Sequence, residues 1–277
     1  MRVAVLQMVS GPSVEDNLRS ATALLAEAAA AGAELAVLPE YFCLFGYQDT
    51  DKLARQEDWG EQERGGGPIQ SALAQAARTH GLWIAGGTLP VGTPDPARAR
   101  NTLPVFGPDG AAVARYDKIH LFRFDDGEKA YDEARTLEAG DAPAWFDLPS
   151  RDGHTWRIGL SVCYDLRFPE LYRGYAAAGC DLLLVPSAFT HVTGQAHWEL
   201  LLRARAVENL AYVAAAAQGG VHDNGRRTWG HSMVVEPWGE VVAERAEDGP
   251  GIALAELDAG RVAGLRTRLP ALEHRRL

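Results

Sequence analysis

Three side chains with useful chemistry stand where apolar runs end. Cys163 follows such a run in GLSVCYDLRFPELYR, Glu40 ends the run LAVLPE, and Lys118 lies in YDKIHLF. A cysteine can attack an electrophilic carbon, a desolvated glutamate can move protons near neutral pH, and a lysine ammonium can stabilise a developing oxyanion. Together these groups would support nucleophilic catalysis.

Each of the three also has an ordinary structural explanation. A single cysteine is most often a small apolar core residue, which suits Cys43 and Cys180. Glu40 could be a salt-bridged strand terminus, and Lys118 could lie on a solvated strand face. Cys163 stands apart because polar residues crowd the sequence after it, and a nearby cation or base favours a reactive thiol. These neighbours are Asp165, Arg167 and Glu170.

Other familiar catalytic and binding motifs are missing. GHSMV, residues 230–234, has valine where the serine-hydrolase elbow needs its second glycine. The chain has neither G-x-G-x-x-G nor a Walker A motif, and neither H-E-x-x-H nor paired cysteines. We therefore expect no cofactor and no metal. A Cys–His hydrolase remains an alternative, with His154, His191 and His197 as candidate bases.

The hydrophobic pattern predicts alternating strands and helices. Strands are expected at 2–8, 35–40, 82–90, 102–106, 112–121, 156–162, 181–185, 232–236 and 240–244, and helices at 13–31, 68–80, 169–178 and 196–210. Nearly continuous apolar strands need burial on both faces, so we predict an α/β fold of mixed sheets covered by helices. Glu40 and Cys163 would both lie just beyond a strand, and such positions gather along one sheet edge.

Composition restricts the classes of partner and compartment. The chain has 277 residues and a net charge of −10, which opposes binding to nucleic acid or to an anionic membrane. It shows no membrane-length apolar run, and its first residues do not resemble a signal peptide. Three cysteines suit a reducing compartment. We expect a cytoplasmic protein with one compact domain over 1–277.

The motifs that carry the three reactive residues also occur in a known family. LPE, YDKIHLF and CYDLRFPE, followed by FTHVTGQAHWELLLRARAVEN, GHSMVVEPWG and LPALEHRR, resemble the nitrilase superfamily of carbon–nitrogen hydrolases along the whole chain. The branch they resemble contains deaminated glutathione amidases and omega-amidases. The resemblance implies a four-layer αββα sandwich of two mixed β-sheets flanked by helices.

The resemblance also assigns roles to residues. It implies that Glu40 is the general base, Lys118 the cationic stabiliser and Cys163 the nucleophile. A fourth family position, a second glutamate, falls on Glu133, with Glu128 as a rival because the segment around it departs from the family pattern. The Tyr164 backbone N–H would help to bind the oxyanion.

The implied activity is hydrolysis of a small amide through a thioester on Cys163. Deaminated glutathione is the expected substrate, and omega-amides, N-carbamoyl amino acids and nitriles are alternatives. Arg167 is a hypothesis for a substrate carboxylate ligand, against the alternative of an ion pair with Asp165 or Glu170. The same fold could also serve as a binding scaffold with an idle triad. Family members form dimers, so at least a homodimer is expected. The helix at 196–210 is either a contact in that dimer or part of the monomer's own core.

Overall fold

The computed structural model describes residues 1–59, 66–125, 127 and 130–276. Its helices are α1 (Val14–Ala30), α2 (Pro68–His80), α3 (Pro169–Ala177), α4 (His191–Asn209) and α5 (Ala259–Arg268). The larger sheets contain β1 (Arg2–Gln7), β2 (Leu35–Val37), β3 (Trp83–Ala85), β4 (Leu89–Gly92), β5 (Ala99–Phe106), β6 (Ala112–Asp117), β9 (Ala144–Pro149), β10 (Thr155–Leu160), β11 (Leu182–Leu184), β12 (Tyr212–Ala215), β15 (Ser232–Val235), β16 (Val241–Arg245) and β17 (Gly251–Glu256). Two ribbons pair β7 (Arg123–Asp125) with β8 (Ala130–Asp132) and β13 (Gly219–Val221) with β14 (Arg227–Trp229).

Two mixed sheets form the centre of the molecule. The first has the order β17-β1-β2-β3-β5-β4, with β6 also paired to β5, and the second has the order β16-β15-β12-β11-β10-β9. In each sheet three adjacent central strands run parallel and antiparallel strands flank them. The predicted class of mixed sheets is confirmed.

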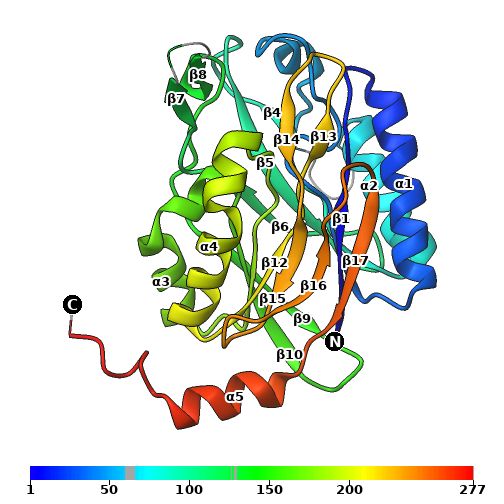
Figure 1. Cartoon of the computed structure of the whole chain (residues 1–277). Coiled ribbons are helices and arrows are strands. Elements are labelled where there is room, and N and C mark those ends of the chain that lie inside the picture. Colours follow the sequence, from blue (N-terminus) through cyan, green and yellow to red (C-terminus); the bar gives the residue numbers. More distant parts are fainter. Residues whose placement is uncertain (60–65, 126, 128–129, 277) are drawn as a thin grey trace.

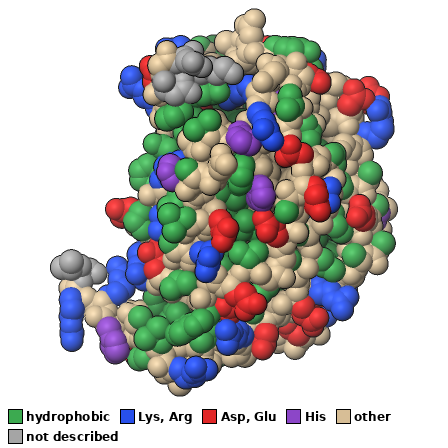
Figure 2. Space-filling model, viewed as in Figure 1, with side chains coloured by type: hydrophobic (Ala, Val, Ile, Leu, Met, Phe, Trp, Pro, Cys, Tyr) green, Lys and Arg blue, Asp and Glu red, His purple; other side chains and the backbone are tan. Residues whose placement is uncertain are grey.

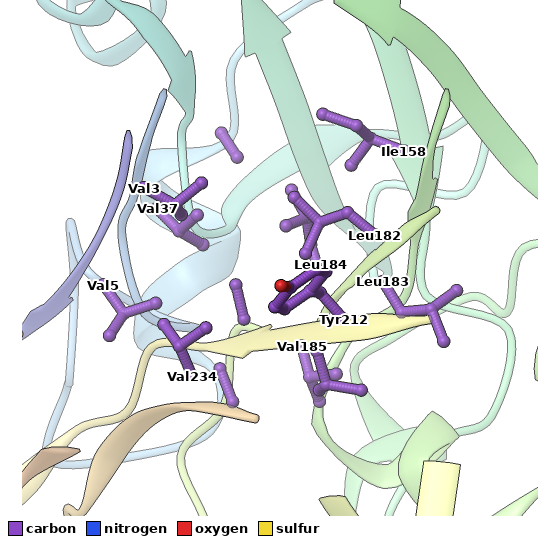
Figure 3. Packing of buried hydrophobic residues seen from close by; sticks show 14 of the residues in the cluster. Val3, Val5, Val37, Ile158, Leu182, Leu183, Leu184, Val185, Tyr212 and Val234 are labelled. Atoms are coloured by element: carbon purple, nitrogen blue, oxygen red, sulfur yellow. The ribbon is translucent and has the colours of Figure 1, made fainter. Parts of the chain in front are cut away.

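The sheets pack face to face, and helices cover their outer faces. In Figure 1, α1 and α2 lie outside the first sheet, and α3 and α4 lie on the opposite side of the molecule. Figure 3 shows the apolar layer between the sheets, where Val3, Val5 and Val37 of the first sheet face side chains of the second, including Ile158, Leu184 and Val234. A second cluster packs α1 and α2 against the first sheet. The arrangement is the expected four-layer αββα sandwich.

Helix ends follow the local signals in the sequence. The Ser13 side chain accepts a hydrogen bond from Asp16 N–H at the start of α1, as expected of an N-cap. Helix α2 begins at Pro68 and is followed by Gly81, whose φ of 61° is the left-handed conformation that glycine adopts without strain. Both helices agree closely with their predicted ranges.

Four predicted elements were wrong in their extent. The strand expected at 112–121 ends at Asp117, so Lys118 lies just beyond it, and the run at 35–40 is a strand only to Val37. The run at 82–90 forms two strands instead of one, β3 and β4, because Gly87 turns the chain with a φ of 58°. Strand β4 then pairs with β5 rather than continuing β3. Helix α4 begins at His191, five residues before the predicted start, because the Thr190 side chain caps it by accepting a bond from Thr193 N–H.

The surface mixes charges of both signs. In Figure 2, acidic and basic side chains are interspersed over the visible face with hydrophobic areas between them. No helix in the described part of the chain has the length and hydropathy needed to cross a membrane. All three cysteines are free.

Candidate active site

Glu40 lies three residues beyond the end of β2 and is 1% exposed. Its Oε1 accepts hydrogen bonds from Lys118 Nζ and Asn101 Nδ2, both at 2.9 Å, and its Oε2 accepts one from Ala188 N–H at 3.1 Å. The Gln218 side chain donates to the Glu40 carbonyl oxygen at 3.0 Å. A carboxylate held by this many donors has a fixed orientation.

Lys118 follows the last residue of β6 and is buried, which contradicts the alternative of a solvated lysine. Its Nζ donates to Glu40 Oε1 at 2.9 Å and to Glu133 Oε2 at 2.8 Å, so the ammonium bridges two carboxylates. Its backbone is tied to the first sheet, because Lys118 N–H donates to the Asn101 carbonyl oxygen at 3.0 Å.

Glu133 comes from the short turn that follows the β7–β8 ribbon. Besides Lys118, its carboxylate accepts bonds from the Tyr41 hydroxyl at 2.6 Å and from Phe122 N–H at 2.7 Å. The structure thus places Glu133 beside the lysine. The rival, Glu128, lies outside the described residues.

Cys163 opens a short 3₁₀ turn, Cys163–Arg167, at the end of the segment that leaves β10. Its φ is 50°, and that of Tyr41, directly after Glu40, is 57°, both unusual for residues other than glycine. Such strain tends to occur at functional sites. Cys163 is 8% exposed, and it lines the same hollow as Glu40. The Cys163 N–H donates to the Pro186 carbonyl oxygen at 2.9 Å, which fixes the turn.

The sequence suggested that the polar residues after Cys163 favour a reactive thiol. Asp165, one of these residues, is instead bound to other groups. Asp165 is fully buried. It accepts bonds from Val162 N–H at 2.8 Å, His120 N–H at 3.0 Å and the Tyr116 hydroxyl at 2.7 Å, and its Oδ1 lies 2.7 Å from His120 Nδ1. Asp165 therefore joins the nucleophile turn to the chain segment that carries Lys118.

Burial and charge set the proton affinities of the four groups. Burial raises the pKa of Glu40, and the nearby Glu133 charge raises it further against the pull of Lys118. Burial also raises the pKa of the Cys163 thiol well above its usual range, with a further contribution from Glu40. Cys163 therefore rests as a thiol beside a carboxylate of increased basicity.

The other two groups stay charged. Burial alone would lower the pKa of Lys118, but the Glu133 and Glu40 carboxylates outweigh it and raise that pKa well above the usual value. Burial alone would raise the pKa of Glu133, but Lys118 and the bonds from Phe122 N–H and the Tyr41 hydroxyl outweigh burial and hold it below its usual value. Lys118 is thus a permanent ammonium.

Cys163 opens into a hollow that is also lined by Arg167. The Arg167 guanidinium lies 5.8 Å from the Tyr164 ring centroid and 5.6 Å from that of Phe189, and its terminal nitrogens lie 3.4 Å from His197 Nδ1. No ion pair with Asp165 or Glu170 occurs among the described residues, so that alternative is not supported.

None of the three candidate histidines lines the hollow that holds Cys163. His154 pairs with Asp181 at 3.1 Å, and His191 packs against Trp229. His197 contacts Arg167 rather than the thiol. The hollow that holds Cys163 is lined by the carboxylates of Glu40 and Glu133 and by none of these imidazoles.

Sequence reasoning missed three residues of the site. Two of them could have been recognised in the sequence. Tyr41 directly follows Glu40, and Asn101 is a buried polar residue in strand β5. The third, Arg226, lines the same hollow from the β13–β14 connection, and no motif in the sequence indicated it.

Comparison with known proteins agrees with this geometry. The sequence pattern of the family described as carbon-nitrogen hydrolase matches residues 2–267. The chain belongs to the carbon-nitrogen hydrolase family. It is therefore a hydrolase of non-peptide carbon–nitrogen bonds, and the resemblance expected from its motifs is confirmed.

Named relatives of this hydrolase cover nearly its full length. It is 39% identical over 275 residues to deaminated glutathione amidase of Synechocystis sp., covering 98% of this chain and 97% of that protein. It is 38% identical over 277 residues to omega-amidase NIT2 of Homo sapiens, covering 99% and 95% respectively.

Solved structures share the fold. Nit3 of Saccharomyces cerevisiae superposes with a TM-score of 0.88 at 30% identity, covering 100% of this chain and 97% of that one. A glutamate-to-glutamine mutant of the amidase from Nesterenkonia sp. AN1 has a TM-score of 0.76 at 30% identity, covering 98% of each chain. In that amidase, acrylamide has undergone Michael addition at the active site cysteine.

Proposed function

We propose that this hydrolase is an amidase that cleaves the amide of a small acidic substrate, deaminated glutathione, through a thioester on Cys163. The observation that carries the proposal is that Cys163 and Glu40 line one hollow, where the Glu40 carboxylate accepts a hydrogen bond from the buried Lys118. The names of the relatives support the substrate class.

The first step forms a bond between Cys163 Sγ and the amide carbon. Glu40 takes the thiol proton as sulfur attacks, so no free thiolate accumulates, in keeping with the raised pKa of Cys163. The amide oxygen gains the electron pair of the former π bond. The Lys118 ammonium and the Tyr164 N–H, which lies in the first turn where N–H groups lack intrahelical partners, stabilise this oxyanion.

The second step breaks the carbon–nitrogen bond. The oxyanion re-forms the carbonyl, and Glu40 gives its proton to the departing amine or ammonia, which leaves an acyl thioester on Cys163. Glu40 then takes a proton from a water molecule that attacks the thioester. The thioester carbon–sulfur bond breaks, the carboxylic acid leaves, and the proton returns to the thiol.

Glu133 keeps Lys118 charged and in place rather than exchanging protons itself. Its pKa is held below the usual value, so it stays ionised while Glu40 cycles between its two forms. Two carboxylates beside one ammonium thereby take different roles, because their surroundings push their pKa values apart.

Arg167 binds a carboxylate of the substrate in this proposal. It lines the hollow beside Cys163, and its guanidinium contacts aromatic rings and an imidazole rather than a carboxylate. Comparing KM of Arg167→Leu for acidic and for neutral amides tests this, and equal changes for both classes count against it.

A screen of amine and ammonia release tests the substrate assignment. The substrates are deaminated glutathione, omega-amides, N-carbamoyl amino acids and nitriles. We expect the highest kcat/KM for deaminated glutathione, with the omega-amides next. A higher kcat/KM for a carbamoyl compound or a nitrile would overturn the amidase assignment, since the same three groups can serve those reactions.

A homodimer completes the proposal. Helix α4 buries Trp198, Leu202 and Ala206 in the core but leaves Leu200 68% exposed and Val207 46% exposed on its outer side. Residues seven apart lie on one helix face. This face is the proposed contact with a second copy of the chain.

A further inference from the structure

The turn that carries Cys163 contains a carbonyl group without its usual backbone partner. In a 3₁₀ turn, the carbonyl oxygen of one residue accepts a hydrogen bond from the N–H three residues later. The residue three positions after Leu166 is Pro169, the first residue of α3, which has no N–H. Leu166 is fully buried, so bulk water cannot pair with this carbonyl. A buried carbonyl without a partner is costly, so a donor from elsewhere in the molecule is expected.

A buried arginine of α4 is that donor. Arg205 is 5% exposed, and it donates to the Leu166 carbonyl oxygen from Nε at 3.1 Å and from Nη2 at 2.8 Å. Its other terminal nitrogen, Nη1, donates to Glu208 Oε1 at 2.8 Å, so the buried charge is paired. A guanidinium presents its donors in a rigid planar fork. The two bonds to one oxygen therefore fix the direction as well as the position of the carbonyl group.

The same guanidinium is also linked to the chain before the turn. It lies over the Tyr172 ring, 5.3 Å from the centroid, and the Tyr172 hydroxyl lies 2.7 Å from Ser161 Oγ. Ser161 is two residues before Cys163, and its hydroxyl donates to the Leu184 carbonyl oxygen in the second sheet at 2.7 Å. Arg205 thus contacts the turn after the nucleophile directly and the segment before it through one aromatic ring.

The backbone at Cys163 needs such support. Its φ of 50° is a left-handed conformation that residues other than glycine adopt at a cost, so the surrounding structure must hold it. The bond from Cys163 N–H to the Pro186 carbonyl oxygen fixes the start of the turn, and the bonds from Arg205 to Leu166 fix its end. Release of the end would let the turn relax and would move the thiol relative to Glu40.

We infer that Arg205 is a positioning residue, which holds the turn of Cys163 in its strained conformation and thereby keeps the thiol aligned with Glu40. The inference rests on the proposed function in one respect, that Cys163 is the nucleophile. Arg205 does not line the hollow that holds Cys163, so it touches neither substrate nor reacting atoms. Its loss should therefore slow the chemical step and leave substrate binding nearly unchanged, because a displacement of about 1 Å at a reacting group can cost about 10²-fold in rate.

Arg205→Met tests the inference on the screened substrate with the highest kcat/KM. We expect kcat to fall about 10- to 100-fold and KM to change by less than about threefold. A kcat close to that of wild type would overturn the inference, as would a loss of kcat/KM carried by KM. This variant also leaves the Glu208 carboxylate without its partner, so it loses stability for a reason unrelated to the turn.

A double variant separates the turn from stability. In Arg205→Met/Glu208→Gln both members of the ion pair lose their charge, so most of the decrease in the midpoint of urea unfolding should be regained. The Leu166 carbonyl still lacks its donor, so kcat should stay about 10-fold or more below that of wild type. Recovery of kcat together with the unfolding midpoint would show a purely structural role and would overturn the inference.

Glu208→Gln alone is the first control. It removes the carboxylate that pairs with Arg205 but keeps both bonds from the guanidinium to the Leu166 carbonyl oxygen. We expect a lower unfolding midpoint and a kcat within about twofold of wild type. A loss of kcat as large as in Arg205→Met would assign the effect to the ion pair and overturn the inference.

Arg203→Met is the second control, matched in its contacts. Arg203 also lies on α4, and it donates from Nε to the Gly239 carbonyl oxygen at 2.7 Å and from Nη1 to Glu199 Oε1 at 3.1 Å. Its carbonyl partner belongs to the connection between β15 and β16 rather than to the turn of Cys163. Its kcat should stay within about twofold of wild type, and a loss equal to that in Arg205→Met would overturn the inference.

Failure of this inference can be distinguished from failure of the proposed function. If wild type cleaves an amide and Arg205→Met keeps its kcat, the inference fails and the proposed function stands. If wild type cleaves a nitrile or a carbamoyl compound best, the amidase assignment fails, and a fall of kcat in Arg205→Met on that substrate still supports the inference. If Cys163→Ala retains activity, the nucleophile is another group and both fail.

Discussion

At the scale of single residues, proton affinity separates two glutamates that contact the same lysine. Glu40 and Glu133 both accept a hydrogen bond from Lys118, yet the pKa of Glu40 is raised and that of Glu133 is lowered. Glu133 has additional donors, the Tyr41 hydroxyl and Phe122 N–H, which favour its charged form. The balance between burial, neighbouring charges and hydrogen bonds therefore decides which carboxylate can serve as a base.

Removing any of the three proposed catalytic side chains should abolish turnover without unfolding the protein. Cys163→Ala removes the nucleophile, Glu40→Gln removes the base, and Lys118→Ala removes the cation near the oxyanion. Each should lower kcat by at least about 10³-fold. Circular dichroism checks the fold. Activity retained in any of the three would contradict the mechanism, as would a comparable loss in the matched control His197→Gln, whose side chain faces Arg167.

The pH profile should report Glu40. The base must be ionised to accept the thiol proton, and its pKa is raised, so the acid limb of kcat/KM should lie at higher pH than the ordinary glutamate value of about 4.3. Asn101→Ala removes a donor to the Glu40 carboxylate and should move the limb to higher pH. Glu133→Gln removes a neighbouring negative charge and should move it to lower pH. Shifts of the same sign in both variants would contradict the assignment.

At the scale of elements, the site depends on how chain segments meet beyond the strand ends. Asp165 joins the turn at Cys163 to the segment after β6 through Val162 N–H, His120 N–H and the Tyr116 hydroxyl. The turn at Gly87 positions the segment that carries Glu40, because Gly87 packs directly against the Pro39 carbonyl oxygen. These contacts set the position of the reactive groups before any substrate binds.

Two glycines with nearly the same backbone conformation should respond differently to alanine. Gly87 has a φ of 58° and Gly81 a φ of 61°. A Cβ on Gly87 would lie 2.2 Å from the Pro39 carbonyl oxygen, whereas one on Gly81 would have no neighbour within 4 Å. Gly81→Ala should lower the free energy of unfolding by about 1–2 kcal/mol, the cost of the left-handed conformation alone.

Gly87→Ala should cost more than this, by roughly a further 2 kcal/mol or more, because the backbone at Pro39 must move. It should also lower kcat, since Glu40 follows Pro39 directly. Urea denaturation measures the first effect and steady-state kinetics the second. Equal destabilisation of the two variants would show that the contact with Pro39 has no energetic weight.

At the scale of the whole molecule, two sheets meet along an apolar layer and carry the reactive residues to one place (Figure 3). Glu40 and Lys118 come from the first sheet and Cys163 from the second. The described α4 and its neighbouring loop leave apolar side chains exposed, among them Leu200 and Trp238. That one domain spans 1–277 remains a prediction.

The proposed dimer can be tested on the outer face of α4. Leu200→Asp places a charge at the centre of that face and should convert the dimer to a monomer in light scattering at micromolar concentration, because a charge without a partner in an apolar contact is costly. Val113→Asp on β6 is the control, since Val113 is 43% exposed on the first sheet, whereas α4 packs against strands β12 and β15 of the second. A wild-type protein that is already monomeric would contradict the proposal.

The sequence by itself determined the local features of this protein. Alternating apolar runs, Ser13 and the Pro68–Gly81 pair placed most strands and helix ends, and the motifs around Glu40, Lys118 and Cys163 indicated the family. These signals are local because capping, turn conformation and side-chain periodicity depend on residues a few positions apart.

Only the tertiary structure decided which distant groups complete the site. Asn101 reaches Glu40 across 61 positions in the chain and Ala188 reaches it across 148, while Arg226 enters from a ribbon that no motif marked. These contacts depend on strand register and on the packing of one sheet against the other, which a local pattern does not encode. Burial, which raises the pKa of Glu40 but is outweighed at Glu133 by Lys118 and the hydrogen bonds to its carboxylate, likewise arises only when the two sheets close over the site.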